Sequence, residues 1–128
     1  MKRASAGLTL DTGALIGVER RKRRVLGLLE LARRDGLVVT LPAIAVAEWW
    51  RGRSDIRDEL LLAVDVEPMT VEVAKLAGEA LAQVRSATLA DAIVMASAAR
   101  RGDVVLTSDF DDLERLRQRF PAVRVLRV

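Results

Sequence analysis

The sequence predicts an α/β fold, in which helices cover both faces of a central parallel sheet of about five strands. Two observations lead to this prediction. Short apolar runs of strand length alternate along the chain with longer segments in which apolar residues recur at helical spacing. The chain has 128 residues, of which 51% are hydrophobic, and it contains no repeat, low-complexity tract or linker. It is therefore expected to form one domain over residues 1–128.

The N-terminal part of the chain is expected to contain one strand and two helices. Residues 8–10 form a short apolar run, and a helical pattern begins just beyond it, over residues 12–19. A second helix is predicted by apolar residues at helical spacing: Val25, Leu28, Leu29 and Ala32. Gly36 is expected to end this helix, because glycine readily adopts the left-handed conformation found after helix C-termini.

The middle of the chain is expected to contain two strands and two helices. Residues 37–41 form a continuous apolar run, and Pro42 suits the first turn of a helix that ends near Gly52. Residues 56–63 show a further helical pattern. Residues 64–67 are expected to form a short strand that ends at a proline.

The C-terminal part is expected to contain three helices and two strands. A long amphipathic helix is predicted by apolar residues at helical spacing: Val73, Ala77, Ala80, Leu81 and Val84. A second helix is expected over residues 91–101, with Gly102 as its stop. The last elements are a strand over residues 104–107, a helix over 111–119 and a strand over 123–128.

The composition favours a cytoplasmic protein that does not associate with membranes. The chain has no cysteine, which suits a reducing compartment. Its longest uncharged apolar run is far shorter than the roughly 20 residues that a membrane span needs. Residues 1–3 are basic, but Asp11 interrupts the following region before the hydrophobic segment of a signal peptide can form.

Basic residues are clustered rather than spread evenly. The chain carries 21 basic and 18 acidic residues, for a net charge of +3, and residues 20–24 read Arg-Arg-Lys-Arg-Arg. Further clusters are Arg33-Arg34, Arg51 with Arg53, and Arg100-Arg101. Such surfaces attract phosphates and give salt-sensitive binding. The alternative is that each cluster is simply a solvated helix face.

Five acidic residues lie at positions typical of a functional site. Asp11 follows the first strand, Glu48 lies in an apolar helix, Asp91 opens a helix of small residues, and Asp109 and Asp112 follow the fourth strand. Parallel strands place residues that follow them at one edge of the sheet. The chain has no histidine, and each pair of carboxylates at about 4 Å would repel by roughly 4 kcal/mol at a dielectric near 20. A cation is therefore needed, and hard oxygen ligands favour Mg²⁺ or Mn²⁺.

The aspartates also have structural interpretations. Asp11 could be an N-cap for the helix that follows it. Thr88 and Asp91 have the spacing of a capping box, with aspartate in place of the usual glutamate. Either Asp109 or Asp112 is expected to cap the last helix.

Glu48 is expected to be buried, because its neighbours in the helix are apolar. A buried glutamate is costly unless it is paired or bound to a metal. The main structural alternative for Glu48 is a salt bridge with Arg51, one helical turn further on. The two interpretations remain open at this point.

Four segments taken together resemble the motifs of the PIN-domain ribonucleases, especially the VapC-type toxins of bacterial toxin–antitoxin pairs. The segments read Leu-Thr-Leu-Asp-Thr-Gly-Ala-Leu-Ile at residues 8–16, Val-Ala-Glu at 46–48, Asp-Ala-Ile-Val-Met-Ala at 91–96 and Val-Leu-Thr-Ser-Asp at 105–109. Asp112 follows the last segment and is the alternative position for its acid. The chain departs from many relatives at Thr88, where they carry another acid, so no metal role is assigned there.

This resemblance implies a single PIN-like domain that binds Mg²⁺ or Mn²⁺ and hydrolyses RNA. It implies metal binding by Asp11, Glu48, Asp91 and Asp109, and a catalytic role for these four residues together with Asp112. Because histidine is absent, the base would be a hydroxide generated at the metal or one of these carboxylates. The implied partners are an RNA substrate, a cognate antitoxin and a second copy of the chain.

Three other functions have partial support in the sequence. Residues 11–14 read Asp-Thr-Gly-Ala, as in aspartic proteases, but those enzymes are almost entirely β-structured. A signalling receiver domain needs a lysine near its late strands, and the only lysines are Lys2, Lys22 and Lys75. The third alternative is a non-catalytic binding module of the PIN-like fold. The acids present in all four motifs argue against it.

Aromatic residues make up 3% of the chain, which is too little for a base-stacking platform of the kind that binds single strands. Selectivity is therefore expected to come from RNA shape and phosphate placement. Trp49 and Trp50 are adjacent on a predicted helix and point about 100° apart. At least one of them is expected to be partly exposed or to lie in an interface.

Overall fold

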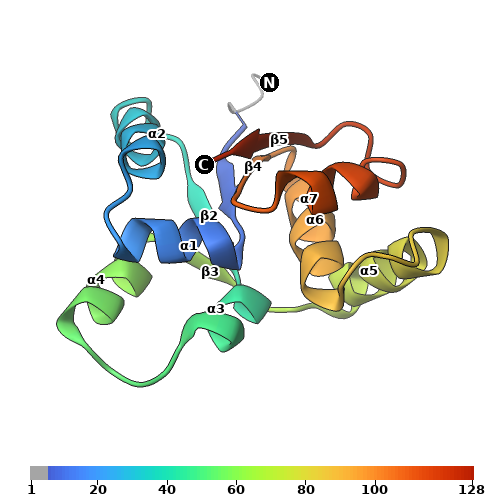
Figure 1. Ribbon diagram of the computed structural model, residues 1–128, viewed down its shortest axis with the longest axis horizontal. Coiled ribbons are helices and arrows are strands. Elements are labelled where there is room, and N and C mark those ends of the chain that lie inside the picture. The colour runs from blue at the N-terminus through green and yellow to red at the C-terminus, as the bar shows by residue number, and fades with distance from the viewer. Residues whose placement is uncertain (1–5) are drawn as a thin grey trace.

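The computed structural model describes residues 6–128, so the basic residues 1–3 considered above lie outside the described part. Five parallel strands form one sheet in the order β3-β2-β1-β4-β5 (Figure 1). The strands are β1 Leu8–Leu10, β2 Val39–Pro42, β3 Asp65–Glu67, β4 Val104–Thr107 and β5 Arg124–Arg127. The helices are α1 Thr12–Glu19, α2 Arg23–Arg34, α3 Ala43–Trp49, α4 Asp55–Ala63, α5 Val71–Gln83, α6 Leu89–Arg101 and α7 Phe110–Leu116.

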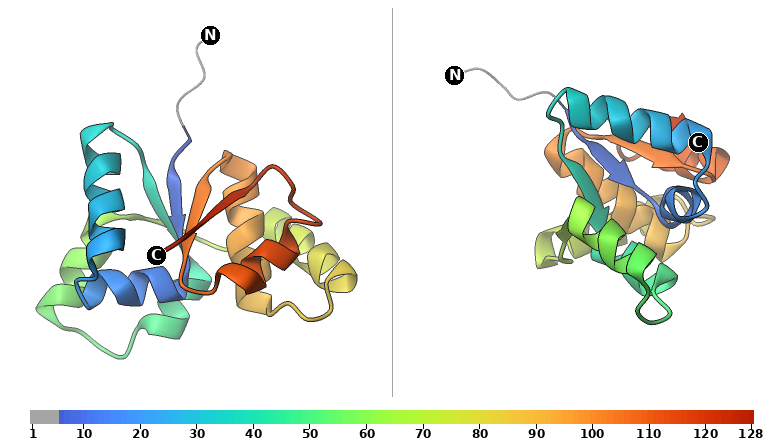
Figure 2. Two further views of the ribbon diagram at one scale, coloured as in Figure 1. Left: turned by 45° about the horizontal axis from the view of Figure 1, so that its top comes forward. Right: turned by 90° about the vertical axis from the view of Figure 1, so that its left-hand side faces the viewer.

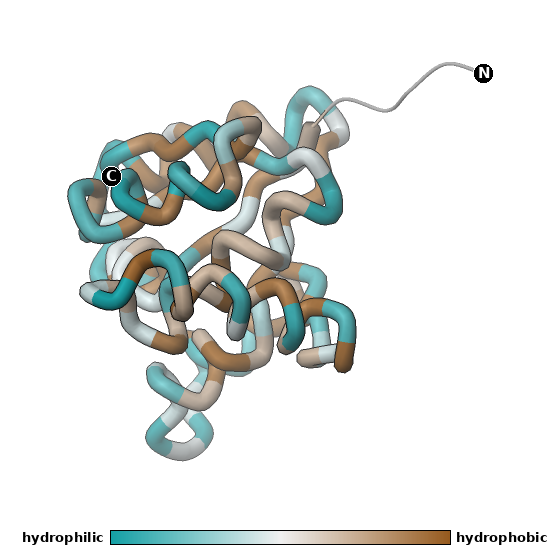
Figure 3. Tube along the Cα trace, turned by 90° about the vertical axis from the view of Figure 1, so that its right-hand side faces the viewer, coloured by the Kyte–Doolittle hydropathy of each residue, from teal (hydrophilic) through white to brown (hydrophobic). Residues whose placement is uncertain are grey.

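Each face of the sheet is covered by its own group of helices, as predicted (Figure 2). Leu8, Leu10 and Leu106 pack against α1 and α2 on one face. Val105 points to the other face, where it packs with α5, α6 and α7. In Figure 3, hydrophobic and hydrophilic residues are mixed along the helices of this second face. Helix α5 is buried on one side only, whereas α6 is buried over residues 92–98.

Most of the predicted elements are confirmed, and the differences are at their ends. The second strand was expected over residues 37–41 but covers Val39–Pro42, because Pro42 still pairs with Glu67 of β3. Pro42 is therefore not in the first turn of α3 but is its N-cap, and α3 ends at Trp49 instead of near Gly52. Helix α7 ends at Leu116, before the expected residue 119, and the chain then forms turns ahead of a proline.

The sheet excludes two of the alternative functions. A sheet whose five strands are all parallel, with seven helices in residues 6–128, is not the nearly all-β fold of an aspartic protease. The strand order also differs from the 2-1-3-4-5 order of receiver-type folds. Within residues 6–128, no helix is both long enough and apolar enough to cross a membrane.

A buried polar network fixes the C-terminal end of α6 against the sheet. Asp103 is buried and accepts hydrogen bonds from the Gly7 N–H (3.0 Å), the Thr9 hydroxyl (2.9 Å) and Arg101 Nε (2.9 Å). Arg101 also pairs with Glu67 at the end of β3. Because all these groups have partners, the network is structural, and it holds α6 in the orientation that places its first turn at the opposite end.

Candidate active site

All five acids singled out in the sequence line one pocket of about 510 Å³. The pocket lies at the carboxyl edge of the sheet, between the N-termini of α1 and α6, helix α3 and the loop after β4. The acids are Asp11, Glu48, Asp91, Asp109 and Asp112. Parallel strands therefore bring together side chains that are almost 100 residues apart in the sequence.

Asp11 is buried at the bottom of the site, and its carboxylate is an N-cap as well as a pocket group. Oδ1 accepts a hydrogen bond from the Ala14 N–H at 2.7 Å, and Oδ2 accepts one from the Thr107 hydroxyl. Burial raises the pKa of the Asp11 carboxyl from 3.8 to about 6, although these hydrogen bonds lower it. The charges of Asp91 and Asp109 raise it further.

Asp91 lies in the first turn of α6, where its backbone N–H donates to the Thr88 hydroxyl at 3.1 Å. The predicted cap at Thr88 is therefore confirmed, and the Asp91 carboxylate still lines the pocket. Partial burial raises the pKa of the Asp91 carboxyl, a hydrogen bond with Thr88 lowers it, and the charges of Asp112, Asp109 and Glu48 raise it. The repulsion among these acids is the electrostatic condition that a cation would relieve.

The prediction that Asp109 or Asp112 caps α7 is wrong. Asp109 occupies the N-cap position, but its side chain makes no capping hydrogen bond. Its backbone N–H instead donates to the Thr107 hydroxyl at 2.8 Å. Asp112 forms a salt bridge with Arg115 at 2.6 Å. This pair is half-exposed, and the charge of Asp112 still raises the pKa of the Asp91 carboxyl.

The prediction that Glu48 is buried is also wrong, because Glu48 is exposed. Ala45 and Trp49, one turn apart, form the buried face of α3, and Glu48 points away from that face into the pocket. The salt bridge with Arg51 does not form either. Arg51 donates to the carbonyl oxygen of Trp50, and Glu48 accepts a hydrogen bond from the Thr12 hydroxyl at 2.5 Å.

Three further residues position the acids and were not recognised from the sequence. The Thr107 hydroxyl links Asp11 to the backbone of Asp109, and the Thr12 hydroxyl orients Glu48. Gly13 allows α1 to approach the loop after β4, since a Cβ on Gly13 would lie 1.8 Å from Ser108 Oγ. The available signal was their position, because each lies inside one of the acidic motifs.

The carboxylates that line the pocket are oxygen ligands of the kind that Mg²⁺ and Mn²⁺ take. Within residues 6–128, no three acidic side chains lie close enough together to form a ready metal cage. Mg²⁺ dehydrates reluctantly, keeps several waters, and is commonly held by one or two carboxylates together with substrate phosphates. An open pocket lined by five carboxylates, two of which have raised pKa values, meets that requirement.

The PIN domain family model matches residues 8–118, which covers most of the chain and all five acids. The chain belongs to the PIN domain family. The match includes all four motifs and leaves out the last strand of this PIN domain. No curated protein sequence gave a significant match.

Three solved structures resemble this PIN domain over nearly their whole length. VapBC2 from Rickettsia felis, bound to a promoter DNA fragment, has a TM-score of 0.76 at 12% identity, covering 94% of this chain and 98% of the other. DNA-bound VapBC from Salmonella typhimurium has a TM-score of 0.75 at 16% identity, with coverages of 96% and 98%. A toxin–antitoxin complex from Klebsiella pneumoniae has a TM-score of 0.68 at 17% identity, with coverages of 95% and 96%. At these identities, the likeness establishes the fold.

At least one of the two tryptophans is partly exposed, as predicted, but Trp50 is the C-cap of α3 and not a helical residue as expected. Trp49 is buried, and its Nε1 donates to Glu19 at 3.0 Å. Trp50 is partly exposed and meets Trp49 edge to face, with ring centroids 6.0 Å apart. Trp50 is therefore the tryptophan available to a partner.

Proposed function

We propose that this PIN domain is a Mg²⁺- or Mn²⁺-dependent endoribonuclease that acts as the toxin of a toxin–antitoxin pair. The observation that carries the proposal is the convergence of five carboxylates in one pocket of a PIN fold. In this proposal Asp11, Glu48, Asp91 and Asp109 hold the metal, and Asp112 adds negative charge at the rim.

Asp11 and Asp91 have distinct parts in the proposed reaction. Bound Mg²⁺ or Mn²⁺ supplies a Lewis acid and lowers the pKa of water. Thr107 and the Ala14 N–H fix both oxygens of Asp11, so this carboxylate is held rigidly. Partial burial raises the pKa of the Asp91 carboxyl, which makes it a better proton acceptor than an ordinary carboxylate. The test is cleavage of single-stranded RNA by the purified protein, with and without a chelator.

We also propose that the protein pairs with itself and that a cognate antitoxin suppresses its activity. The resembling structures are VapBC and toxin–antitoxin complexes. The chain has a second, mainly apolar cleft of about 460 Å³ that includes Leu26 and Leu29 of α2 and Leu60 of α4. Such a cleft fits an apolar segment of a partner protein.

Binding of the antitoxin is expected to change the fluorescence of Trp50 but not that of Trp49. The test uses two single-tryptophan proteins. Trp49→Phe retains the partly exposed Trp50, and Trp50→Phe retains the buried Trp49 as the matched control. If neither protein reports binding and neither substitution weakens it, α3 lies outside the interface.

A further inference from the structure

The turn between α1 and α2 has an arginine where the backbone conformation favours glycine. Arg21 has a φ of 58°, in the left-handed region, and no other non-glycine residue of the described chain has a positive φ. The Lys22 N–H donates to the Gly17 carbonyl (2.9 Å), and the Arg21 N–H donates to the Val18 carbonyl (3.0 Å). These two bonds define a Schellman motif, whose left-handed position is usually glycine.

The same chain uses glycine for the same motif at the other end of α2. There the left-handed residue is Gly36, with a φ of 68°, and the Gly36 and Leu37 N–H groups donate to Arg33 and Ala32. A side chain with a Cβ is disfavoured in this conformation. Arg21 therefore occupies its position at a cost to the backbone, which indicates a requirement for its side chain.

The charges around Arg21 are also unfavourable for the fold. Lys22 is the N-cap of α2 and Arg23 its first residue, and the first turn contains no acid. Cations at this end oppose the helix dipole. Arg20, Arg21, Lys22 and Arg23, called here the turn cluster, are all exposed, and none forms a salt bridge with the described residues.

Each of the other basic clusters contains an arginine with an acidic partner, such as Arg53 with Asp58, although Arg34 and Arg51 form no salt bridge with the described residues. Arg33 pairs with Glu30 at 2.5 Å, Arg100 pairs with Glu72 at 3.1 Å, and Arg101 belongs to the buried network. The turn cluster therefore differs from these clusters in having its charge unneutralised. An exposed group of four uncompensated cations is a surface for an anion of several charges.

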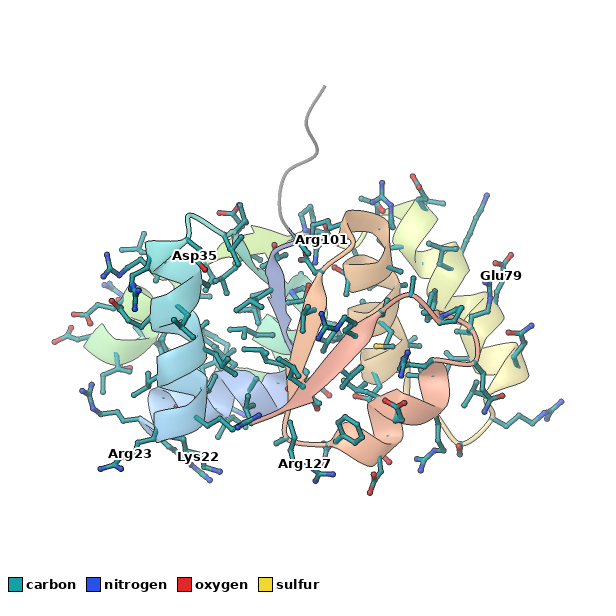
Figure 4. All side chains as sticks on the ribbon, turned by 90° about the horizontal axis from the view of Figure 1, so that it is seen from above. Lys22, Arg23, Asp35, Glu79, Arg101 and Arg127 are labelled. Carbon is teal, nitrogen blue, oxygen red and sulfur yellow. The ribbon has the colours of Figure 1, made fainter. Side chains whose placement is uncertain are left out.

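The end of β5 lies between the turn cluster and the acidic pocket and contacts residues next to both. Arg24 Nε donates to the Arg127 carbonyl at 2.6 Å, which joins the first turn of α2 to β5. The Arg127 guanidinium lies 5.0 Å from the centre of the Phe110 ring, and Phe110 directly follows the pocket residue Asp109. In Figure 4, Lys22, Arg23 and Arg127 lie along one edge of the molecule, and Asp35 lies at the opposite end of α2.

We propose that the turn cluster binds the phosphate backbone of the RNA strand whose scissile bond lies in the acidic pocket. This inference rests on the proposed nuclease function and adds a second contact site to it. Helix α1 has eight residues and is about 12 Å long, and it separates the turn cluster from Asp11. A short stretch of nucleic acid can span this length. Backbone contacts suit a chain whose aromatic content is too low for base stacking.

The test measures RNA affinity and stability in the same variants. Arg21→Gly and, separately, Arg23→Ala are expected to weaken binding of a short fluorescein-labelled single-stranded RNA, in chelator, without lowering the melting temperature. Each is expected to reduce the slope of log K against log salt by about 0.7 over about 50 to 200 mM KCl, because one phosphate contact is lost. Arg21→Gly is expected to raise the melting temperature, since it removes the strained φ.

Arg34→Ala is the matched control, because it removes one exposed charge from the other end of α2. It is expected to leave the RNA affinity unchanged. If the turn variants bind RNA with wild-type affinity and slope, or if Arg34→Ala weakens binding equally, the inference is overturned. If the turn variants lose antitoxin binding but keep RNA binding, the inference is also overturned, because the turn cluster would then bind an acidic protein. If wild-type protein neither binds nor cuts RNA, the nuclease proposal fails as well.

Discussion

The Asp91→Asn protein is expected to cleave RNA about 10²–10³-fold more slowly than wild type while remaining folded. Asparagine keeps the shape of the side chain. The helix cap is also kept, because the group that donates to the Thr88 hydroxyl is the backbone N–H of residue 91. The substitution removes one of the charges that face the other acids in the pocket. The metal would lose an anionic ligand, and metal binding contributes several kcal/mol to the transition state of such reactions.

The matched control for Asp91 is Asp35→Asn. Asp35 is an exposed aspartate at the end of α2 that does not line the acidic pocket. Its substitution changes the net charge by the same amount and is expected to leave the cleavage rate unchanged. A folded Asp91→Asn protein that cuts as fast as wild type would show that the site assignment is wrong.

The Asp11→Asn protein is expected to be more stable than wild type at neutral pH, by at most about 3 kcal/mol, although it loses activity and the hydrogen bond that the Thr107 hydroxyl donates to Asp11. The folded-state pKa of Asp11 is raised to about 6 from 3.8. The Asp11 carboxyl therefore contributes most to the stability of wild type at a pH below 3.8, its pKa in the unfolded state. This contribution is lost as the pH rises through about 6. Asparagine carries no charge to desolvate and remains a good N-cap for α1.

Chemical denaturation of both proteins between about pH 4 and pH 8 measures this difference. The advantage of Asp11→Asn is expected to be small at the acidic end and to grow through about pH 6. Mg²⁺, which binds the folded state, is expected to raise the melting temperature of wild type but not of the variant. An advantage that is the same at both ends of the pH range would contradict the raised pKa of Asp11.

Local sequence signals predicted the helix ends that adjacent residues determine, but not the ends of α3 and α7. The cap at Thr88 and the stops at Gly36 and Gly102 each depend on a few adjacent residues. The end of β2 was misplaced because it depends on a tertiary contact, the pairing of Pro42 with Glu67. The left-handed Arg21 could not be predicted either, because arginine carries no local preference for that conformation.

The sequence predicted which acids gather, because residues that follow parallel strands share one edge of the sheet. It did not predict how each acid is held. The exposure of Glu48 depends on which face α3 buries, and the pairing of Asp112 with Arg115 depends on side-chain conformation. The link from Thr107 to Asp11 joins residues far apart in the chain, so no local pattern contains it.

The most direct test of the proposed function is the initial rate of RNA cleavage by wild-type protein as free Mg²⁺ is increased after treatment with a chelator. We predict no cleavage in the chelator and a saturable return of activity with Mg²⁺ or Mn²⁺, which Asp91→Asn protein does not show. Full activity in the chelator would contradict a metal-dependent site. A folded protein that binds RNA but cuts none at any Mg²⁺ concentration would instead be a non-catalytic binding module.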